Sequence, residues 1–267
     1  MKLFMVYFAL LALALFAMGP FLWLLSTSLK TVGNVYAFPP QIIPWPVSFE
    51  NYVGVWKALH LEKYVINTLH ITAVGVVGTL LISALAAYPL ARMHFPGREV
   101  VFVALLSTFV LPNPGGLIIN FLTLQKMQLI NTLSAVYLPS LATPFGIFLL
   151  RQAYLAIPAE LEDAARIDGA GELTVWWRIS LPLIKPSVAT LAIFNFMGYW
   201  NSFLWPLIVL QDPDKYPIAV ALQYLQGMFW DNFRLVAAGT MFSMVPVLVV
   251  FFSMQRYFIS GVVGALK

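Results

Sequence analysis

Long stretches of apolar residues, separated by short polar segments, dominate this sequence. Six of them reach the length of about 20 residues that crosses the hydrocarbon of a bilayer. Because a spanning backbone must satisfy its own hydrogen bonds in lipid, the pattern predicts an all-α, polytopic membrane protein of about six transmembrane helices. The stretches run from Leu3 to Leu29, Tyr64 to Ala91, Val100 to Leu122, Leu133 to Leu155, Leu181 to Leu210 and Leu235 to Met254.

Composition agrees with lipid as the solvent of this chain. Hydrophobic residues make up 61% of it and charged residues 10%, with a mean hydropathy of +0.85. Soluble domains are roughly half apolar and a quarter charged. The net charge of +4 comes from Lys and Arg residues scattered between the apolar stretches, so we expect membrane lipid and no nucleic acid as a partner. We expect residues 1–267 to form a single transmembrane domain.

The distribution of basic residues predicts the orientation in the membrane. Six spans put both termini on one side, and cytoplasmic segments of membrane proteins carry an excess of Lys and Arg. If the termini are cytoplasmic, nine of the fifteen basic residues lie inside and six outside, which is a modest bias in the expected direction. The inner set is Lys2, Arg92, Arg98, Arg151, Arg166, Arg178, Lys185, Arg256 and Lys267. The segment 30–63, with Pro39, Pro40, Pro44 and Pro46, then predicts an ordered external loop.

Several of the predicted spans are interrupted by residues that break helices. Such breaks are tolerated at membrane depth where protein buries them or where they line a water-filled cavity. Two interpretations stay open. The breaks mark a pathway in which Asn195, Tyr199 and Asn201 offer hydrogen bonds to a sugar, or they are packing kinks beside an aromatic belt. The breaking residues are Pro112 to Gly116 in the third span, Pro139 and Pro144 in the fourth, and Asn195, Gly198, Asn201 and Pro206 in the fifth.

The loop between the fourth and fifth spans, residues 151–185, differs from the others because it carries five of the eleven acidic residues. Pro158 favours the first turn of a helix, and the carboxylates after it favour the positive end of the helix dipole. Gly169 ends this helix, and Glu162 can pair with Arg166 one turn later. We expect a short helix at the membrane surface, shaped to fit a cleft of a cytosolic partner.

Spacings in this loop resemble a known family. Asp163-Ala164-Ala165, followed by Gly169 and by Leu181-Pro182, resembles the EAA loop of binding-protein-dependent ABC importer permeases, and Ile179 also fits that pattern. The segment 157–170 is similar to the second permease subunit of the maltose-type carbohydrate-uptake branch. The family usually has Glu where this chain has Asp163. Segments 48–52, 91–97 and 255–258, with Gly261, Gly264 and Lys267, resemble further parts of that branch, so the resemblance covers essentially the whole chain.

The resemblance implies a permease subunit that imports a sugar, a polyol or glycerol phosphate across the inner membrane of a prokaryote. It implies four kinds of partner: a second permease, two ATPase subunits that bind ATP and Mg²⁺, an extracytoplasmic solute-binding protein and lipid. It also implies that loop 151–185 holds a coupling helix that docks on the ATPase. The residues expected at that contact are Glu160, Glu162, Asp163, Ala164, Ala165, Asp168, Gly169, Leu181 and Pro182.

Motifs of enzymes are absent from the sequence. There is no G-x-x-x-x-G-K-[ST] phosphate loop, no H-E-x-x-H and no G-x-S-x-G, so we expect no catalytic residue, no metal and no cofactor on this chain. The apolar cores contain almost no ionisable residue, which disfavours a carrier coupled to protons or sodium. A secondary carrier or passive pore that works without an ATPase stays the alternative, and transport that persists after ATP depletion would distinguish it.

Overall fold

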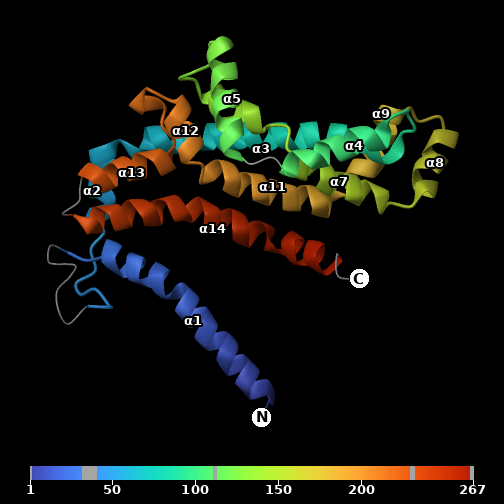
Figure 1. Ribbon diagram of the computed structural model, residues 1–267. Helices are drawn as coiled ribbons and strands as arrows, with labels where there is room; N and C mark the ends of the chain where they lie inside the picture. Colours follow the sequence, from blue (N-terminus) through green and yellow to red (C-terminus); the bar gives the residue numbers. More distant parts are fainter. Residues whose placement is uncertain (1, 32–40, 111–112, 229–231, 265–267) are drawn as a thin grey trace. The chain divides into compact units, whose positions relative to one another are not determined.

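The structure, a computed structural model, describes residues 2–31, 41–110, 113–228 and 232–264 (Figure 1). Within these ranges the chain forms α-helices joined by short turns and contains no strand, which confirms the predicted all-α class. The contacts gather in two compact units, described separately below. Unit 1 comprises residues 1–65 and 218–246, and unit 2 comprises residues 66–217 and 247–267.

Unit 1 contains the first helix, α1 (Lys2–Ser28), whose apolar side chains are exposed along most of its length. It also holds α2 (Glu50–Leu59), α13 (Ile218–Met228) and the first part of α14 (Phe233–Gly264). Its core brings together Val55, Leu61, Val236 and Ala238.

The amide of Asn51, in α2, completes the end of α1. Its Nδ2 donates to the carbonyl oxygens of Ser28, at 2.9 Å, and of Lys30, at 2.8 Å. Carbonyl groups in the last turn of a helix have no partner within the helix, so a side chain from elsewhere must satisfy them.

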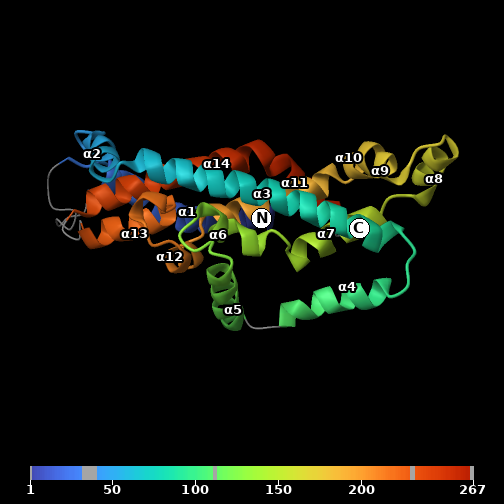
Figure 2. The same ribbon diagram turned by 90° about the horizontal axis from the view of Figure 1, so that it is seen from above.

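Unit 2 is built on the long helix α3 (Leu61–Arg92), of which residues 66–92 belong to this unit. Helices α7 and α11 pack against each other, and the core of the unit joins α3 to α7 through Ala87, Tyr88, Leu150 and Tyr154. Figures 1 and 2 show α8 and α9 together near the end of α3, away from α5 and α12. The other helices are α4 (Arg98–Ser107), α5 (Asn113–Lys126), α6 (Leu133–Tyr137), α7 (Pro144–Leu155), α8 (Ala159–Ile167), α9 (Glu172–Val175), α10 (Leu181–Leu183), α11 (Lys185–Trp200) and α12 (Leu204–Val209).

Among the described residues, three helical segments are long and apolar enough to cross a membrane, and the number rises to five if each of two bent pairs is one span. The three are Leu3–Ser28, Leu61–Arg92 and Phe233–Gln255. The first bent pair joins Leu133–Ser140 to Pro144–Leu155 at 47°, and the second joins Glu172–Leu183 to Lys185–Trp200 at 76°. The predicted prolines of the fourth span therefore lie at a bend, because Pro139 and Pro144 flank it.

The predicted span Leu181 to Leu210 falls into three helices, α10, α11 and α12. The predicted span Val100 to Leu122 is divided as well. Its residues form α4, a 3₁₀ turn from Thr108 to Val110, and α5, and both helices are shorter than a full crossing. Residues 111–112 between them, including Pro112, lie outside the described residues.

Candidate functional site

Helix α8 is the short helix that the sequence predicts after Pro158. It ends at Ile167, and the next turn is closed by two backbone bonds, from Ala170 N to Ala165 O at 2.9 Å and from Gly169 N to Arg166 O at 3.0 Å. This pair of bonds requires a residue in the left-handed conformation, and Gly169 supplies it with a φ of +85°. Nothing lies within 4 Å of a Cβ placed there, so backbone conformation rather than space selects glycine.

The predicted coupling residues divide between two faces of this loop. Glu160, Asp163, Ala164, Asp168 and Gly169 are exposed, whereas the side chain of Glu162 is buried, with 1% of the residue exposed. Of the remaining predicted contacts, Ala165, Leu181 and Pro182 are half-buried.

Glu162 lies among three polar groups from three segments. Its Oε1 is 3.2 Å from Arg92 Nε and accepts a hydrogen bond from Ser180 Oγ at 2.8 Å. Its Oε2 is 3.6 Å from Arg166 Nη2, so the pair predicted from the sequence is present. The contact of Glu162 with Arg92 is shorter than its contact with Arg166. Neither Arg92 nor Ser180 is among the site residues predicted from the sequence. The sequence signal for Arg92 was its place in the segment 91–97.

Arg166 joins the two ends of the loop. Its Nη1 donates to Asp163 Oδ1 at 2.8 Å, and its Nε donates to Glu172 Oε1 at 2.7 Å. Tyr88, on α3, donates to the other oxygen of Glu172 at 3.2 Å. The hydrogen bond to Glu172 raises the pKa of the Arg166 guanidinium further above its ordinary value, so this pairing holds across the physiological pH range.

Arg151, on α7, holds the last turn of α3 in place. Arg151 Nε donates to the carbonyl of Leu90 at 3.0 Å, and Nη2 lies 3.0 Å from Glu99 Oε1. The guanidinium also stacks over the ring of Phe102, 3.8 Å from its centroid. Here "the charged end" means the side chains of Tyr88, Arg92, Glu99, Arg151, Glu162, Arg166, Glu172 and Ser180.

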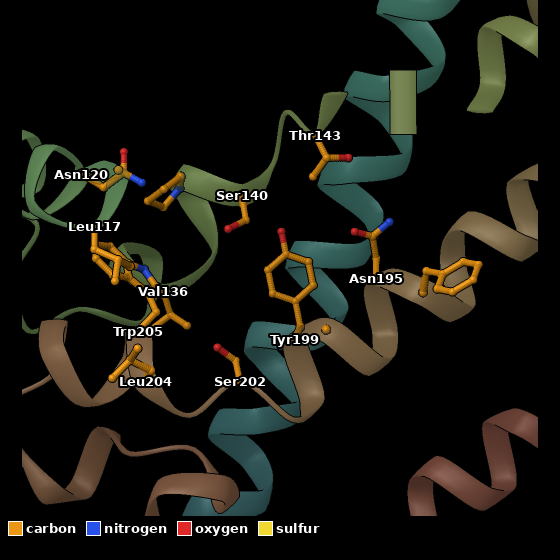
Figure 3. A pocket seen from close by; sticks show the side chains of 14 residues that line it. Leu117, Asn120, Val136, Ser140, Thr143, Asn195, Tyr199, Ser202, Leu204 and Trp205 are labelled. Atoms are coloured by element: carbon orange, nitrogen blue, oxygen red, sulfur yellow. The ribbon is translucent and has the colours of Figure 1, made fainter. Parts of the chain in front are cut away.

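Elsewhere in unit 2, a cavity of about 490 Å³ opens between α5, the α6 to α7 segment, α11 and α12 (Figure 3). None of the side chains that line it is charged. Hydroxyl and amide groups alternate with aromatic rings on its wall, a mixture suited to uncharged polar ligands. The lining residues are Gly116, Leu117, Asn120, Val136, Pro139, Ser140, Thr143, Phe194, Asn195, Gly198, Tyr199, Ser202, Leu204 and Trp205. We call this cavity the pocket.

Two of the three predicted pathway residues, Asn195 and Tyr199, line the pocket. The Asn195 amide donates to Leu191 O at 2.8 Å, which leaves its oxygen available to a ligand. Asn201 does not line the pocket: it is exposed just beyond the end of α11 and donates to Met197 O at 3.0 Å.

Tyr199 connects the pocket to α3. Its hydroxyl lies 3.1 Å from Thr79 Oγ1, and its ring packs so closely on Gly75 that a Cβ there would come within 2.7 Å of it. No sequence signal points to this contact, because Gly75 and Thr79 are ordinary small residues of an apolar helix.

Some predicted elements are not described. The side chains of the C-terminal segment 256–267, the prolines 39 and 40, and the charge of Lys2 lie outside the described residues. In the part of the chain that is described, no group of three or more His, Asp or Glu side chains could hold a metal ion.

Comparisons with known proteins agree on one kind of protein. Residues 79–263 match the family model described as binding-protein-dependent transport system inner membrane component. The chain is 35% identical to the arabinooligosaccharides transport system permease protein AraQ of Halalkalibacterium halodurans, over 99% of this chain and 92% of the relative. It is 33% identical to the lactose transport system permease protein LacG of Rhizobium radiobacter, over 98% and 96%. Its structure matches a subunit of a bacterial ABC transporter involved in import of the acidic polysaccharide alginate, with a TM-score of 0.85, 27% identity, and coverage of 96% and 97%.

Proposed function

Because this chain belongs to the family of binding-protein-dependent transport system inner membrane components, we propose that it forms one half of the path by which an uncharged sugar enters the cell. The chain is a multi-pass permease subunit of an ABC importer of the carbohydrate-uptake kind, and it is not an enzyme. This confirms the main prediction from the sequence over the alternative of a carrier or pore without an ATPase. ATP acts on the partner ATPase in systems of this kind.

The exposed face of α8 is the observation that carries the proposed coupling role. Glu160, Asp163 and Asp168 face outward on a helix whose other side is tied to α3 through Glu162. A charged, exposed face on a firmly held helix suits docking on another protein, since little conformational freedom is lost on binding. We therefore place the ATPase on this face, with Ala164 and Gly169 allowing close approach.

The pocket supports the proposed solute class. Burying a charge at membrane depth is costly, so a path for a charged solute would need compensating side chains on its wall. The described wall instead offers amides, hydroxyls and the rings of Phe194, Tyr199 and Trp205. Neutral mono-, di- or oligosaccharides fit this chemistry, and we include Asn195 and Tyr199, but not Asn201, in the part of the path that the pocket forms.

The remaining subunits follow from the same proposal. A second permease completes the path in a heterodimer, two ATPase subunits bind at the cytoplasmic side, and an extracytoplasmic binding protein delivers the solute. With α8 in the cytoplasm, both termini are cytoplasmic as well.

Affinity purification tests this assembly. The detergent-solubilised chain should recover an ATPase and a second permease from its host membrane. The double variant Asp163→Lys with Asp168→Lys reverses the charge of the exposed face and should lose the ATPase. Glu62→Lys, at a half-buried acid near the start of α3, should retain it. A wild-type chain that purifies alone would contradict the proposal.

A further inference from the structure

The exposed face of α8 does not require the buried carboxylate of Glu162 for docking. Glu162 is 1% exposed and its main partner, Arg92, has a side chain that is 11% exposed. Burying two charges is costly unless each is paired and hydrogen-bonded. Docking on an ATPase would be served equally well by the exposed acids, so the buried pair requires another explanation.

The position of Arg92 supplies that explanation. It is the last residue of α3, and its Nη2 donates to the carbonyl of Ile157, two residues before α8 begins, while its Nε lies 3.2 Å from Glu162 Oε1 in an ion pair. Ser180, in the π turn from Trp176, donates to the same carboxylate from the other side. The start of α8, its first turn and the segment after it are thus held at one point to the end of α3.

The same helix reaches the pocket. Thr79 and Gly75 of α3 contact Tyr199, which lines the pocket. Thr79 precedes Arg92 by 13 residues, which is about 20 Å along a continuous helix. An α-helix transmits displacement along its axis because its turns are hydrogen-bonded to one another, and Pro89, which lies within this stretch, removes only one of those bonds.

We propose that Arg92 and Glu162 form a buried clamp that makes α8 and α3 move as one body, so that α3 carries movement of the coupling loop to Tyr199 at the wall of the pocket. Arg92 and Glu162 are positioning residues in this scheme: they touch neither the ATPase nor the solute. The inference rests on the proposed docking of the ATPase on α8.

The absence of cysteine from the chain allows a direct readout at the pocket. Ser202, half-buried on the pocket wall, is replaced in a Ser202→Cys reporter. The complete importer, with cysteine-free partner subunits, is reconstituted in proteoliposomes. The rate at which a charged maleimide modifies the thiol is then measured without nucleotide and with ATP and vanadate. We expect the two rates to differ by at least about fivefold, the lower end of ordinary coupling between two sites.

Two single variants break the clamp in the reporter background. Glu162→Gln keeps the size of the side chain and an acceptor for Ser180 but removes the charge, and Arg92→Gln removes the opposite charge. Each should reduce the difference between the two rates to less than about twofold, below ordinary coupling between two sites. The matched control is Glu62→Gln, on the same helix, where the side chain of the acid is 43% exposed and pairs with His60 at 3.3 Å. It should keep the full difference.

The reversed pair Arg92→Glu with Glu162→Arg separates a clamp from a general loss of structure. It restores opposite charges at the same two positions, and it should regain at least half of the wild-type difference. If the single variants lose the ATPase on purification, the reversed pair decides the question. A reversed-pair complex that binds the ATPase and changes its modification rate with nucleotide supports the clamp. A reversed pair that does not bind the ATPase, or whose modification rate does not change, contradicts the clamp.

The outcomes also separate this inference from the proposed function. A wild-type chain that recovers no ATPase contradicts the proposed function itself. A wild-type complex that responds to nucleotide, beside a Glu162→Gln complex that responds equally, contradicts the clamp alone.

Discussion

The charged end and the pocket join α3 to its neighbours by different chemistry. At the charged end, Arg92 and Arg151 tie α3 to two other segments through carboxylates and backbone carbonyls. At the pocket, the same helix meets α11 through a glycine, a threonine and the ring of Tyr199, and no charged side chain lines the cavity.

Depth in the membrane explains the difference. A charge near the end of a spanning helix can be paired and partly hydrated, whereas a charge near the middle costs about 3 kcal/mol or more. Near the middle of the membrane, helices contact one another through close packing of small residues and through hydrogen bonds between uncharged groups. The comparison predicts that variants at the charged end act through lost pairing, and that variants at the pocket act through volume.

Arg151→Leu should have the largest effect on stability. It removes the hydrogen bond to Leu90 O, the pair with Glu99 and the stacking on Phe102. We expect a loss of about 3 kcal/mol in the free energy of unfolding, measured by thermal unfolding in detergent. The control is Arg98→Leu, which removes the other, more exposed partner of the same Glu99 and should cost less than about 0.5 kcal/mol. Equal losses in the two variants would remove the distinction between buried and exposed pairing.

Gly75→Ala tests the role of volume at the pocket and should cost about 2 kcal/mol through overpacking. Its Cβ would lie 2.7 Å from the ring of Tyr199, which is buried and hydrogen-bonded and therefore cannot yield easily. Gly78→Ala is the matched control, because its Cβ would meet only the tip of the flexible Leu141 side chain, also at 2.7 Å. A Gly78→Ala variant as unstable as Gly75→Ala would show that the ring is not the rigid element.

Substitutions at Gly169 separate backbone conformation from charge in the coupling loop. Gly169→Ala should cost about 1 kcal/mol, because a residue with a Cβ resists a φ of +85°. Asn and Asp both tolerate this conformation better, and they have the same size. We expect Gly169→Asn to transport nearly as well as wild type, and Gly169→Asp to insert normally but lose coupling between ATP hydrolysis and sugar uptake in proteoliposomes. Equal uptake by the two variants would contradict a contact between this turn and an acid-sensitive partner surface.

Tyr199→Phe should have the smallest effect. It keeps the ring against Gly75 and removes only the hydrogen bond to Thr79, which at membrane depth is worth about 0.6 kcal/mol. Thermal unfolding should therefore change little, and Thr79→Val, which also removes the 3.4 Å hydrogen bond from Thr79 to Ser140 O, should give a somewhat larger loss. A loss several times larger would mean that the hydroxyl, and not the packing, secures α3 to α11.

Sequence patterns predicted the all-α class and α8, because Pro158 and Gly169 act through local backbone chemistry at the two ends of that helix. Apolar length predicted six spans, whereas the described residues hold three to five. Helices α2 and α13 lie outside the predicted spans. The divided third span was marked by Pro112 and the glycines after it, but the pattern did not show that two separate helices result.

Contacts between distant segments could not be read in the same way. Glu162 was grouped with the exposed acids because helical spacing pairs it with Arg166, and nothing local distinguishes it from Asp163. Its burial depends on Arg92 and Ser180, which are 70 residues before it and 18 residues after it. Likewise, Asn195 and Tyr199 share the pocket but Asn201 does not, because α11 ends at Trp200 and the chain turns there.

The bond between Asn51 and the end of α1 also has a consequence for the order of biosynthesis. The carbonyls of Ser28 and Lys30 are satisfied by a residue that the ribosome adds 23 and 21 positions later. When α1 leaves the ribosome, the carbonyls at its C-terminal end therefore still lack this partner. Only the translation of α2 supplies it, so the end of α1 is completed together with α2.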